Sequence, residues 1–300
     1  MTAGPVGFIG LGNMGGRMAR CVVAAGREVV GYDPDAERVT AAGARPAGSP
    51  AAVTADAEVV LLSLPDSPVV ERVMRGDEGV LSAARAGQVV VDLSTASPRS
   101  TVALHAELAE KGAEYLDAGI SGGAAAAEKG TLTLMTGGSE EALRRVRPIL
   151  DAFSAKIFHM GASGNGHIAK LLNNFLNGVS LSATAEVMVA AKKSGLELHT
   201  FLDVLNASSG VNFATLNRFP KIVDGDYLEG GLTGKLMTKD VVLYVDRLHQ
   251  LGVASLNAAG PMASFGLATA LGYGDQISNR VVDALGDVSG GVRVHPGKEG

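Results

Sequence analysis

The sequence is poor in several residue types, and each shortage excludes a class of protein. Its 300 residues include a single cysteine, Cys21, so no disulfide can form within the chain. No uninterrupted apolar run reaches the ~18 residues that a membrane-spanning helix requires. The first ten residues carry no basic segment before an apolar run, so no secretory signal is expected. We therefore expect a globular protein of the reducing cytoplasm.

Clustered positive charge and metal-ligand spacings are also missing. The 26 Lys and Arg residues are outnumbered by 31 Asp and Glu, which gives a net charge of −5. Sequence-independent binding to nucleic acid requires clustered Lys and Arg to neutralise phosphates. The six histidines are scattered, and none stands at a metal-ligand spacing from another His, Cys or Glu. We expect neither nucleic acid, nor a membrane, nor a metal among the partners.

The order of predicted elements indicates two domains. In the first half, short β-branched runs alternate with helical patterns, which is typical of a parallel sheet covered by helices. The expected strands are residues 5–9, 29–32, 59–62, 89–92, 113–117, 131–135 and 156–159. A helical pattern of close to thirty residues then begins at Gly166, and no strand-like alternation follows it. We predict a Rossmann-type doubly wound α/β domain over residues 1–162 and an all-helical domain over residues 163–300.

A glycine-rich turn joins the first predicted strand to the first predicted helix. It has the pattern G-x-G-x-x-G and consists of Gly10, Leu11, Gly12, Asn13, Met14 and Gly15. In a dinucleotide site the first glycine makes the sharp turn, the second lets the backbone approach a pyrophosphate, and the third lets the helix pack closely on the strand. The pyrophosphate then meets the free N–H groups of the helix start. This context predicts a bound nicotinamide dinucleotide.

Asp33 ends the second predicted strand, about 20 residues beyond the glycine motif. A carboxylate at this place accepts hydrogen bonds from the adenine-side ribose and repels a 2′-phosphate, so it favours NAD over NADP. Arg38, five residues on, is a residue that can recruit such a phosphate, and NADP stays open. Two further pairs follow predicted strands and are expected to line the cofactor cleft: Leu64-Pro65 and Ser94-Thr95.

Two later segments are candidates for the chemistry. Ser121, Gly122 and Gly123 place a hydroxyl and two amides without side chains in succession, which suits a small carboxylate but is equally typical of a plain turn. Lys170 and Asn174 stand four residues apart on the long predicted helix and therefore share one face. Burial beside a cofactor would lower the pKa of a lysine amine toward neutrality and make it a workable acid or base. A lysine that reaches solvent is the simpler alternative.

Taken in order, the motifs resemble those of the β-hydroxyacid dehydrogenase family, which includes 3-hydroxyisobutyrate dehydrogenase and tartronate semialdehyde reductase. The resemblance extends from Val6 to about Leu285. The matching stretches are G-F-I-G-L-G-N-M-G at 7–15, D-L-S-T at 92–95, S-G-G at 121–123, G-T-L-T-L-M-T-G-G at 130–138, G-x-x-x-K-x-x-x-N at 166–174, and Lys239-Asp240.

The resemblance implies an NAD- or NADP-dependent interconversion of a short 3-hydroxy acid and its semialdehyde or ketone, in a homodimer or homotetramer. It assigns the catalytic acid–base role to Lys170, substrate positioning to Asn174, and carboxylate binding to the segment from Ser121 to Gly123. It places Ser94 and Thr95 near the nicotinamide, and it makes Lys239 the lysine that closes over the cofactor.

Two alternatives remain at this stage. One is an imine reductase of the same architecture, in which Asp or Tyr is usual where this chain has Lys170. The other is a dinucleotide-binding module without turnover. Three polar residues of the second half, Asn212, Arg218 and Lys235, are within conceivable reach of the distal end of a substrate. Solvated side chains are the simpler interpretation of all three.

Overall fold

The computed structural model describes residues 4–295, and contacts divide this chain into two units between Lys170 and Leu171. The sequence pattern places the domain boundary near residue 162, where the last predicted strand ends. The physical reason for the later division is that the long helix α9 (Asn165–Lys193) begins against the sheet. A Cβ added to Gly166 in its first turn would lie 2.8 Å from the carbonyl oxygen of Asp117. We describe each unit by itself.

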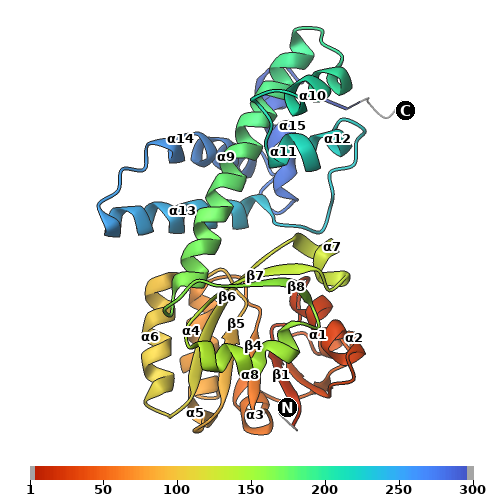
Figure 1. Ribbon diagram of the computed structural model, residues 1–300. Coiled ribbons are helices and arrows are strands. Elements are labelled where there is room, and N and C mark those ends of the chain that lie inside the picture. Colours follow the sequence, from red (N-terminus) through yellow and green to blue (C-terminus); the bar gives the residue numbers. More distant parts are fainter. Residues whose placement is uncertain (1–3, 296–300) are drawn as a thin grey trace. The chain divides into compact units, whose positions relative to one another are not determined.

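The strands of the first unit form one sheet in the order β3-β2-β1-β4-β5-β6-β7-β8. Figure 1 shows this sheet together with its helices. The neighbours pair in parallel except β6 and β7, which are antiparallel. The prediction of a doubly wound sheet is therefore confirmed, with one antiparallel pair that the sequence pattern did not indicate. The strands are β1 (Val6–Ile9), β2 (Val29–Tyr32), β3 (Arg45–Pro46), β4 (Val59–Leu62), β5 (Val89–Asp92), β6 (Glu114–Ser121), β7 (Leu132–Gly137) and β8 (Ser154–His159).

Helices cover the sheet, as expected for strands that are apolar along their whole length. All four residues of β4 are buried, and the same is true of β1 and β5. The helices of this unit are α1 (Gly15–Ala24), α2 (Ala36–Ala41), α3 (Pro50–Asp56), α4 (Ser67–Arg75), α5 (Val80–Ala83), α6 (Pro98–Ala109), α7 (Gly123–Glu128) and α8 (Glu140–Leu150). The strand order changes direction between β1 and β4, and open α/β sheets bind ligands at the carboxyl ends of the strands beside such a point.

The second unit is built from helices, which confirms the predicted fold class. Beyond α9 it contains α10 (Leu198–Asn206), α11 (Phe213–Asn217), α12 (Phe219–Ile222), α13 (Gly234–Leu251), α14 (Ala259–Ala270), α15 (Val281–Val288) and the short 3₁₀ turns at Leu256–Ala258 and Ser278–Arg280. Its core is made by side chains such as Phe219, Met237 and Phe265, which are fully buried. Within residues 4–295 we find no helix with the length and apolar character that crossing a membrane would require.

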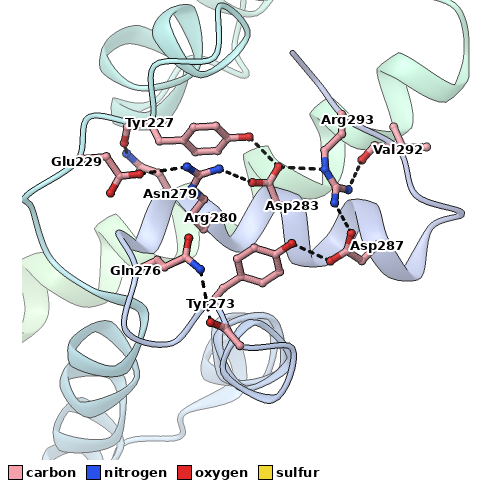
Figure 2. Close-up of polar contacts among 11 residues, drawn as sticks. Tyr227, Glu229, Tyr273, Gln276, Asn279, Arg280, Asp283, Asp287, Val292 and Arg293 are labelled. Atoms are coloured by element: carbon pink, nitrogen blue, oxygen red, sulfur yellow. Dashed lines mark hydrogen bonds and ion pairs between the residues drawn. The ribbon is translucent and has the colours of Figure 1, made fainter. Parts of the chain in front are cut away.

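A polar network ties the end of the second unit to α15 (Figure 2). The Tyr227 hydroxyl donates to Asp283 at 2.7 Å, and the guanidinium of Arg280 pairs with the same carboxylate at 3.0 Å while lying over the Tyr227 ring. Arg293 pairs with Asp287, to which Tyr273 also donates. Each guanidinium in this network therefore faces at least one carboxylate.

Candidate functional site

The glycine-rich turn has the geometry that a dinucleotide site requires. Gly10 has φ +88°, and a side chain there would collide with the carbonyl oxygen of Ser63 at the end of β4. A side chain at Gly15 would collide with the carbonyl of Gly10, so this glycine lets α1 start directly against the strand. At Gly12, by contrast, an added Cβ would meet only the end of the Arg38 side chain, at 3.7 Å. The turn is therefore closed where the fold needs it and open where a pyrophosphate has to approach.

Asp33 is held against this turn. Its Oδ2 accepts a hydrogen bond of 2.8 Å from the backbone N–H of Leu11, and its Oδ1 accepts one of 3.0 Å from Asp35. Arg38 lies 3.8 Å from Asp33 and 3.1 Å from Asp35, so two carboxylates engage its guanidinium. The structure thus brings together the acidic residue and the glycine turn that the sequence identifies separately. Asn13 and Met14 complete the turn; Asn13 is exposed, and Met14 is partly buried against the core.

The two pairs that follow later strands are also brought together. The hydroxyl of Ser94 accepts a hydrogen bond of 3.0 Å from the backbone N–H of Leu64, while the N–H of Ser94 donates to Asp92. Ser94 is buried, Thr95 is partly buried and Pro65 is exposed. Because β4 and β5 are neighbours in the sheet, these residues lie at adjacent carboxyl ends, on the same edge as the glycine turn at the end of β1.

Ser121 ends β6, and the glycines after it begin α7. Gly122 has φ +129° and Gly123 has φ +69°, so both adopt backbone conformations that other residues rarely reach. Both glycines are exposed and Ser121 is partly buried. The segment therefore presents accessible main chain beside a hydroxyl.

Lys170 is a buried residue whose side chain packs on the same strand. A Cβ added to Gly119 of β6 would lie 2.5 Å from the Cβ of Lys170, so only glycine leaves room for the lysine stem. Gly119 stands two residues before Ser121. The structure thus contradicts the simpler interpretation of a solvated lysine, and it sets Lys170 beside the strand that leads to Ser121 and the glycines.

The start of α9, and with it Lys170, is fixed by a residue that sequence reasoning did not single out. The carboxylate of Asp117, fully buried on β6, accepts hydrogen bonds from the N–H groups of Gly164 at 2.7 Å and His167 at 2.8 Å. These bonds satisfy donors that the first turn of a helix leaves without partners inside the helix. Asp117 lies in a segment that the sequence highlights, but nothing local shows that its partners are fifty residues away.

His167 is a second such residue. Its buried ring contacts the hydroxyl of Thr101 at 2.7 Å and the carbonyl of Asp92 at 3.3 Å. Tyr115 donates to the Asp92 carboxylate at 2.8 Å, and burial, followed by the charge of Asp92, raises the pKa of Tyr115 well above its usual value. The phenol therefore stays protonated as a donor. These bonds tie α6, β5, β6 and α9 to one another close to Lys170.

Asn174 is oriented within the second unit by Asp240. The amide nitrogen of Asn174 donates to Asp240 at 2.5 Å, and Lys239 pairs with the other oxygen of that carboxylate at 3.2 Å. Asn174 and Asp240 are both buried, and Lys239 is partly buried. The adjacent Lys239-Asp240 motif of α13 is the signal in the sequence, although its link to Asn174 depends on helix packing.

The three polar residues expected to be solvated differ from one another. Lys235 is exposed and pairs with Asp275 at 2.7 Å. Asn212 caps α11 and accepts from Ser180 of α9, so it is a structural cap rather than a solvated side chain. Arg218 is partly buried, and its guanidinium donates to the side-chain oxygens of Asn279 at 2.6 Å and Asn177 at 3.0 Å. The expectation is therefore wrong for Asn212 and Arg218, because neighbouring helices supply their partners.

Acidic and histidine side chains do not gather into a metal site in the part of the chain that the structure describes: no group of three or more His, Cys, Asp and Glu side chains is placed to hold an ion. The polar groups at the strand ends instead point to a dinucleotide and a small polar ligand.

Comparison with known protein families agrees with this geometry. Residues 5–161 match the NAD-binding domain of 6-phosphogluconate dehydrogenase, and residues 164–285 match the NAD-binding model of NADP-dependent 3-hydroxyisobutyrate dehydrogenase. The cofactor is therefore a nicotinamide dinucleotide.

Individual relatives are similar over nearly the whole chain. The 2-(hydroxymethyl)glutarate dehydrogenase of Eubacterium barkeri is 36% identical over 289 residues, which cover 95% of this chain and 96% of the relative. The NAD-dependent L-serine dehydrogenase of Pseudomonas aeruginosa is 37% identical over 273 residues, 88% of this chain and 90% of the relative.

Among solved structures, the 3-hydroxyisobutyrate dehydrogenase of Mycobacterium tuberculosis, determined with L-serine, has a TM-score of 0.83 and 31% identity. The similarity covers 95% of this chain and 99% of that one. Fold, glycine turn and full-length relatives agree, and the chain is a member of the β-hydroxyacid dehydrogenase family.

Proposed function

We propose that the protein is an NAD-dependent dehydrogenase that oxidises a short 3-hydroxy acid to its semialdehyde or ketone. In the reverse direction it reduces the semialdehyde or ketone to the hydroxy acid. The observation that carries the proposal is the buried lysine, Lys170, packed on Gly119 beside the strand that ends in Ser121. An amine held away from bulk water beside a strand end that can bind a ligand is well placed to transfer a proton.

The bound nicotinamide supplies the hydride chemistry, and the protein supplies orientation and proton transfer. In the oxidative direction the amine of Lys170 accepts the proton of the substrate hydroxyl; in the reductive direction it returns that proton to the oxygen. Ser121 and the amides of Gly122 and Gly123 hold the substrate carboxylate. Asn174, with its own amide fixed by Asp240, keeps the reacting oxygen aligned with the amine.

Cofactor binding is assigned to the turn from Gly10 to Gly15 and to the neighbouring strand ends. Leu64, Pro65, Ser94 and Thr95, which follow β4 and β5, are assigned to the cofactor, and the family resemblance adds Lys239 of α13 to the cofactor-binding residues. A homodimer or homotetramer belongs to the same proposal and is supported by the family resemblance; a location in the reducing cytoplasm belongs to it too and is supported by the single cysteine.

The relatives agree with this substrate class. One relative is named for 2-(hydroxymethyl)glutarate and another for L-serine, and both compounds are 3-hydroxy acids. The experiment that tests the proposal is a panel of short 3-hydroxy acids, each assayed with NAD and NADP by absorbance of the reduced cofactor, with a cyclic imine assayed in parallel. Turnover of at least one hydroxy acid, and none of the imine, is expected. Imine reduction alone, or cofactor binding without any turnover, would refute it.

NAD is the proposed cofactor because Asp33 lies on the glycine turn and Arg38 is engaged by Asp33 and Asp35. Replacing Asp33 with Ser removes the carboxylate that repels a 2′-phosphate and takes away one of the two carboxylates that engage Arg38. We expect the ratio of kcat/KM for NAD to that for NADP to fall by roughly 10–100-fold, the range of one hydrogen bond to a charged group. Glu37→Ser, which removes an exposed acidic side chain from the first turn of α2, is the matched control and leaves the ratio nearly unchanged. An unchanged ratio in Asp33→Ser contradicts the assignment.

A further inference from the structure

Arg218 carries a charge that its own unit does not balance. It stands at the junction of α11 and α12, where its backbone closes one helix and opens the next. Its guanidinium donates to Asn279 and Asn177, which are both neutral, and no carboxylate of residues 4–295 lies within ion-pair distance. Desolvation lowers the pKa of Arg218 to about 10, so the group is still a cation at neutral pH.

Two other partly buried arginines of this unit, both in the network around α15, show how a guanidinium is paired there. Arg280 pairs with Asp283 and Glu229, and Arg293 pairs with Asp287 and Asp283 (Figure 2). Partial burial of a guanidinium is thus accompanied by carboxylates in that network, because an isolated charge is expensive to remove from water. Arg218 departs from that pairing, as does Arg247 of α13, whose guanidinium contacts Gln250.

The surroundings of Arg218 hold it in one position. Asn279 is buried and is itself fixed, because its amide donates to the carbonyl of Tyr227 at 2.8 Å (Figure 2). Asn177 belongs to α9, and the ring of Phe213 lies 5.8 Å from the guanidinium. A guanidinium has five N–H donors, of which the two neutral amides take two. The remaining donors form a fixed fork that matches a carboxylate or a phosphate.

The place of Asn177 on α9 relates Arg218 to the proposed substrate. Asn177 follows Asn174 by three residues on α9, so both side chains lie on one face of the helix. The rise between them is about 4.5 Å, a distance that a few carbon atoms span. Asn174 is the residue proposed to align the reacting oxygen, and Arg218 is bound one turn further along the same face.

We propose that Arg218 binds a second anionic group at the distal end of the substrate, so that the preferred substrates are 3-hydroxy acids with a further carboxylate. This inference rests on the proposed function and narrows its substrate class. The bound anion supplies the countercharge that the unit itself does not give to Arg218. Arg218 acts in substrate selection, while the proton transfer remains with Lys170.

The test compares two substrates that differ in one charge. One is a 2-(hydroxymethyl) dicarboxylic acid, and the other has the same skeleton with the distal carboxylate replaced by a carboxamide. We expect the wild-type kcat/KM to be at least ~10-fold higher for the diacid than for the amide. We expect Arg218→Gln to lower kcat/KM for the diacid by ~10–100-fold and to leave kcat/KM for the amide unchanged, so that the two values become similar. Arg218→Lys retains part of the preference. Arg247→Gln, which removes the same charge from α13 in the same unit, leaves the ratio unchanged.

Binding gives a readout that does not depend on turnover. With NAD saturating, glutarate is expected to raise the Tm of the wild-type protein more than its monoamide does, and Arg218→Gln is expected to abolish the difference. A wild-type protein that turns over short monocarboxylic 3-hydroxy acids but does not distinguish the diacid from its amide contradicts this inference alone, and that result needs no variant. If kcat/KM falls equally for both substrates in a folded Arg218→Gln protein, Arg218 has a structural role and does not bind the distal carboxylate. Absence of turnover with every hydroxy acid overturns the proposed function, and this inference with it.

Discussion

The candidate site residues of the two units are held largely in different ways. In the first unit, three side-chain oxygens accept hydrogen bonds from backbone N–H groups; the pairs are Asp33 with Leu11, Ser94 with Leu64, and Asp117 with His167. The side-chain pairs of Tyr115 with Asp92 and of Thr101 with His167 lie behind them. In the second unit, side chains bind other side chains across helices; the pairs are Asn174 with Asp240, Tyr227 with Asp283, and Arg218 with Asn279.

The difference has a physical cause and a functional consequence. A backbone N–H is present at nearly every position, so a glycine-rich turn and one acidic residue build a site that tolerates change elsewhere. A pair of side chains needs two particular residues far apart in the sequence, and replacing either one alters the site. We therefore assign proton transfer to the first unit, which ends with Lys170, and the choice of substrate to the second unit, which also contributes Asn174.

The largest effect expected from this comparison follows from Lys170→Ala. Loss of a general acid–base group lowers kcat by ~10²–10⁴-fold, and the loss should be similar for every hydroxy acid, unlike the selective loss in Arg218→Gln. The dissociation constant of NAD, measured by quenching or calorimetry, should change little. Lys192→Ala, an exposed lysine near the end of α9, is the control. Wild-type turnover in Lys170→Ala would show that Lys170 does not transfer the proton, and the assignment of proton transfer to the first unit would be wrong.

A smaller effect is expected from Gly119→Ala. The added methyl group would meet the Cβ of Lys170 at 2.5 Å, so the lysine stem has to move. Displacement of a reacting group by about 1 Å can cost up to ~10²-fold, and we expect kcat to fall by ~10–100-fold on all substrates. Gly48→Ala, where nothing lies within 4 Å, is the matched control in the same unit. Unchanged kcat in a correctly folded Gly119→Ala protein would show that the position of Lys170 on β6 does not matter.

The smallest expected effect concerns Glu197, a side chain of the second unit that binds backbone N–H groups and not another side chain. Glu197 caps α10 by accepting from the backbone N–H groups of Thr200 at 2.7 Å and His199 at 3.1 Å. These bonds, that to Thr200 first, lower the pKa of Glu197 from 4.5 to about 2. A lowered pKa in the folded state means that the stabilisation is complete above pH 4.5 and is lost as the pH falls toward 2.

Glu197→Gln tests this exception. We expect it to lower the Tm by roughly 1–3 °C at pH 7, the scale of a helix cap, and the difference from wild type to shrink as the pH falls from 4.5 toward 2. Thermal unfolding followed by circular dichroism at several pH values measures it. The control is Glu186→Gln, an exposed change on α9. A difference that stays constant down to pH 2 would show that main-chain capping does not operate here.

Much of the first unit can be predicted from sequence because its signals are local. The strands at 29–32, 59–62 and 89–92 are found where apolar β-branched runs predict them, since runs buried on both faces leave few other assignments. The turn from Gly10 to Gly15 is recognisable because each of its three glycines is required for a different steric reason. The long helix α9 is equally clear, as no proline interrupts it.

The remaining features depend on contacts between distant residues. The antiparallel pairing of β7 with β6 cannot be predicted from the sequence of either strand. The alternation of apolar and polar residues identifies a strand but does not give its direction in the sheet. Asp117 and Asp240 are single acidic residues whose importance arises only when α9 brings its first turn and Asn174 to them. Arg218 has the same character, since only packing shows that its partners are amides and not carboxylates.

The most direct test of the central claim is the transfer of a label. A 3-hydroxy acid carrying deuterium on the carbon that bears the hydroxyl group is incubated with NAD and the wild-type protein, and the reduced cofactor is isolated and examined by NMR. The account predicts one deuterium at C4 of the nicotinamide in the reduced cofactor, and its formation slows in step with kcat in Lys170→Ala. Reduced cofactor without the label, or transfer that is as fast in Lys170→Ala as in the wild type, would contradict the account.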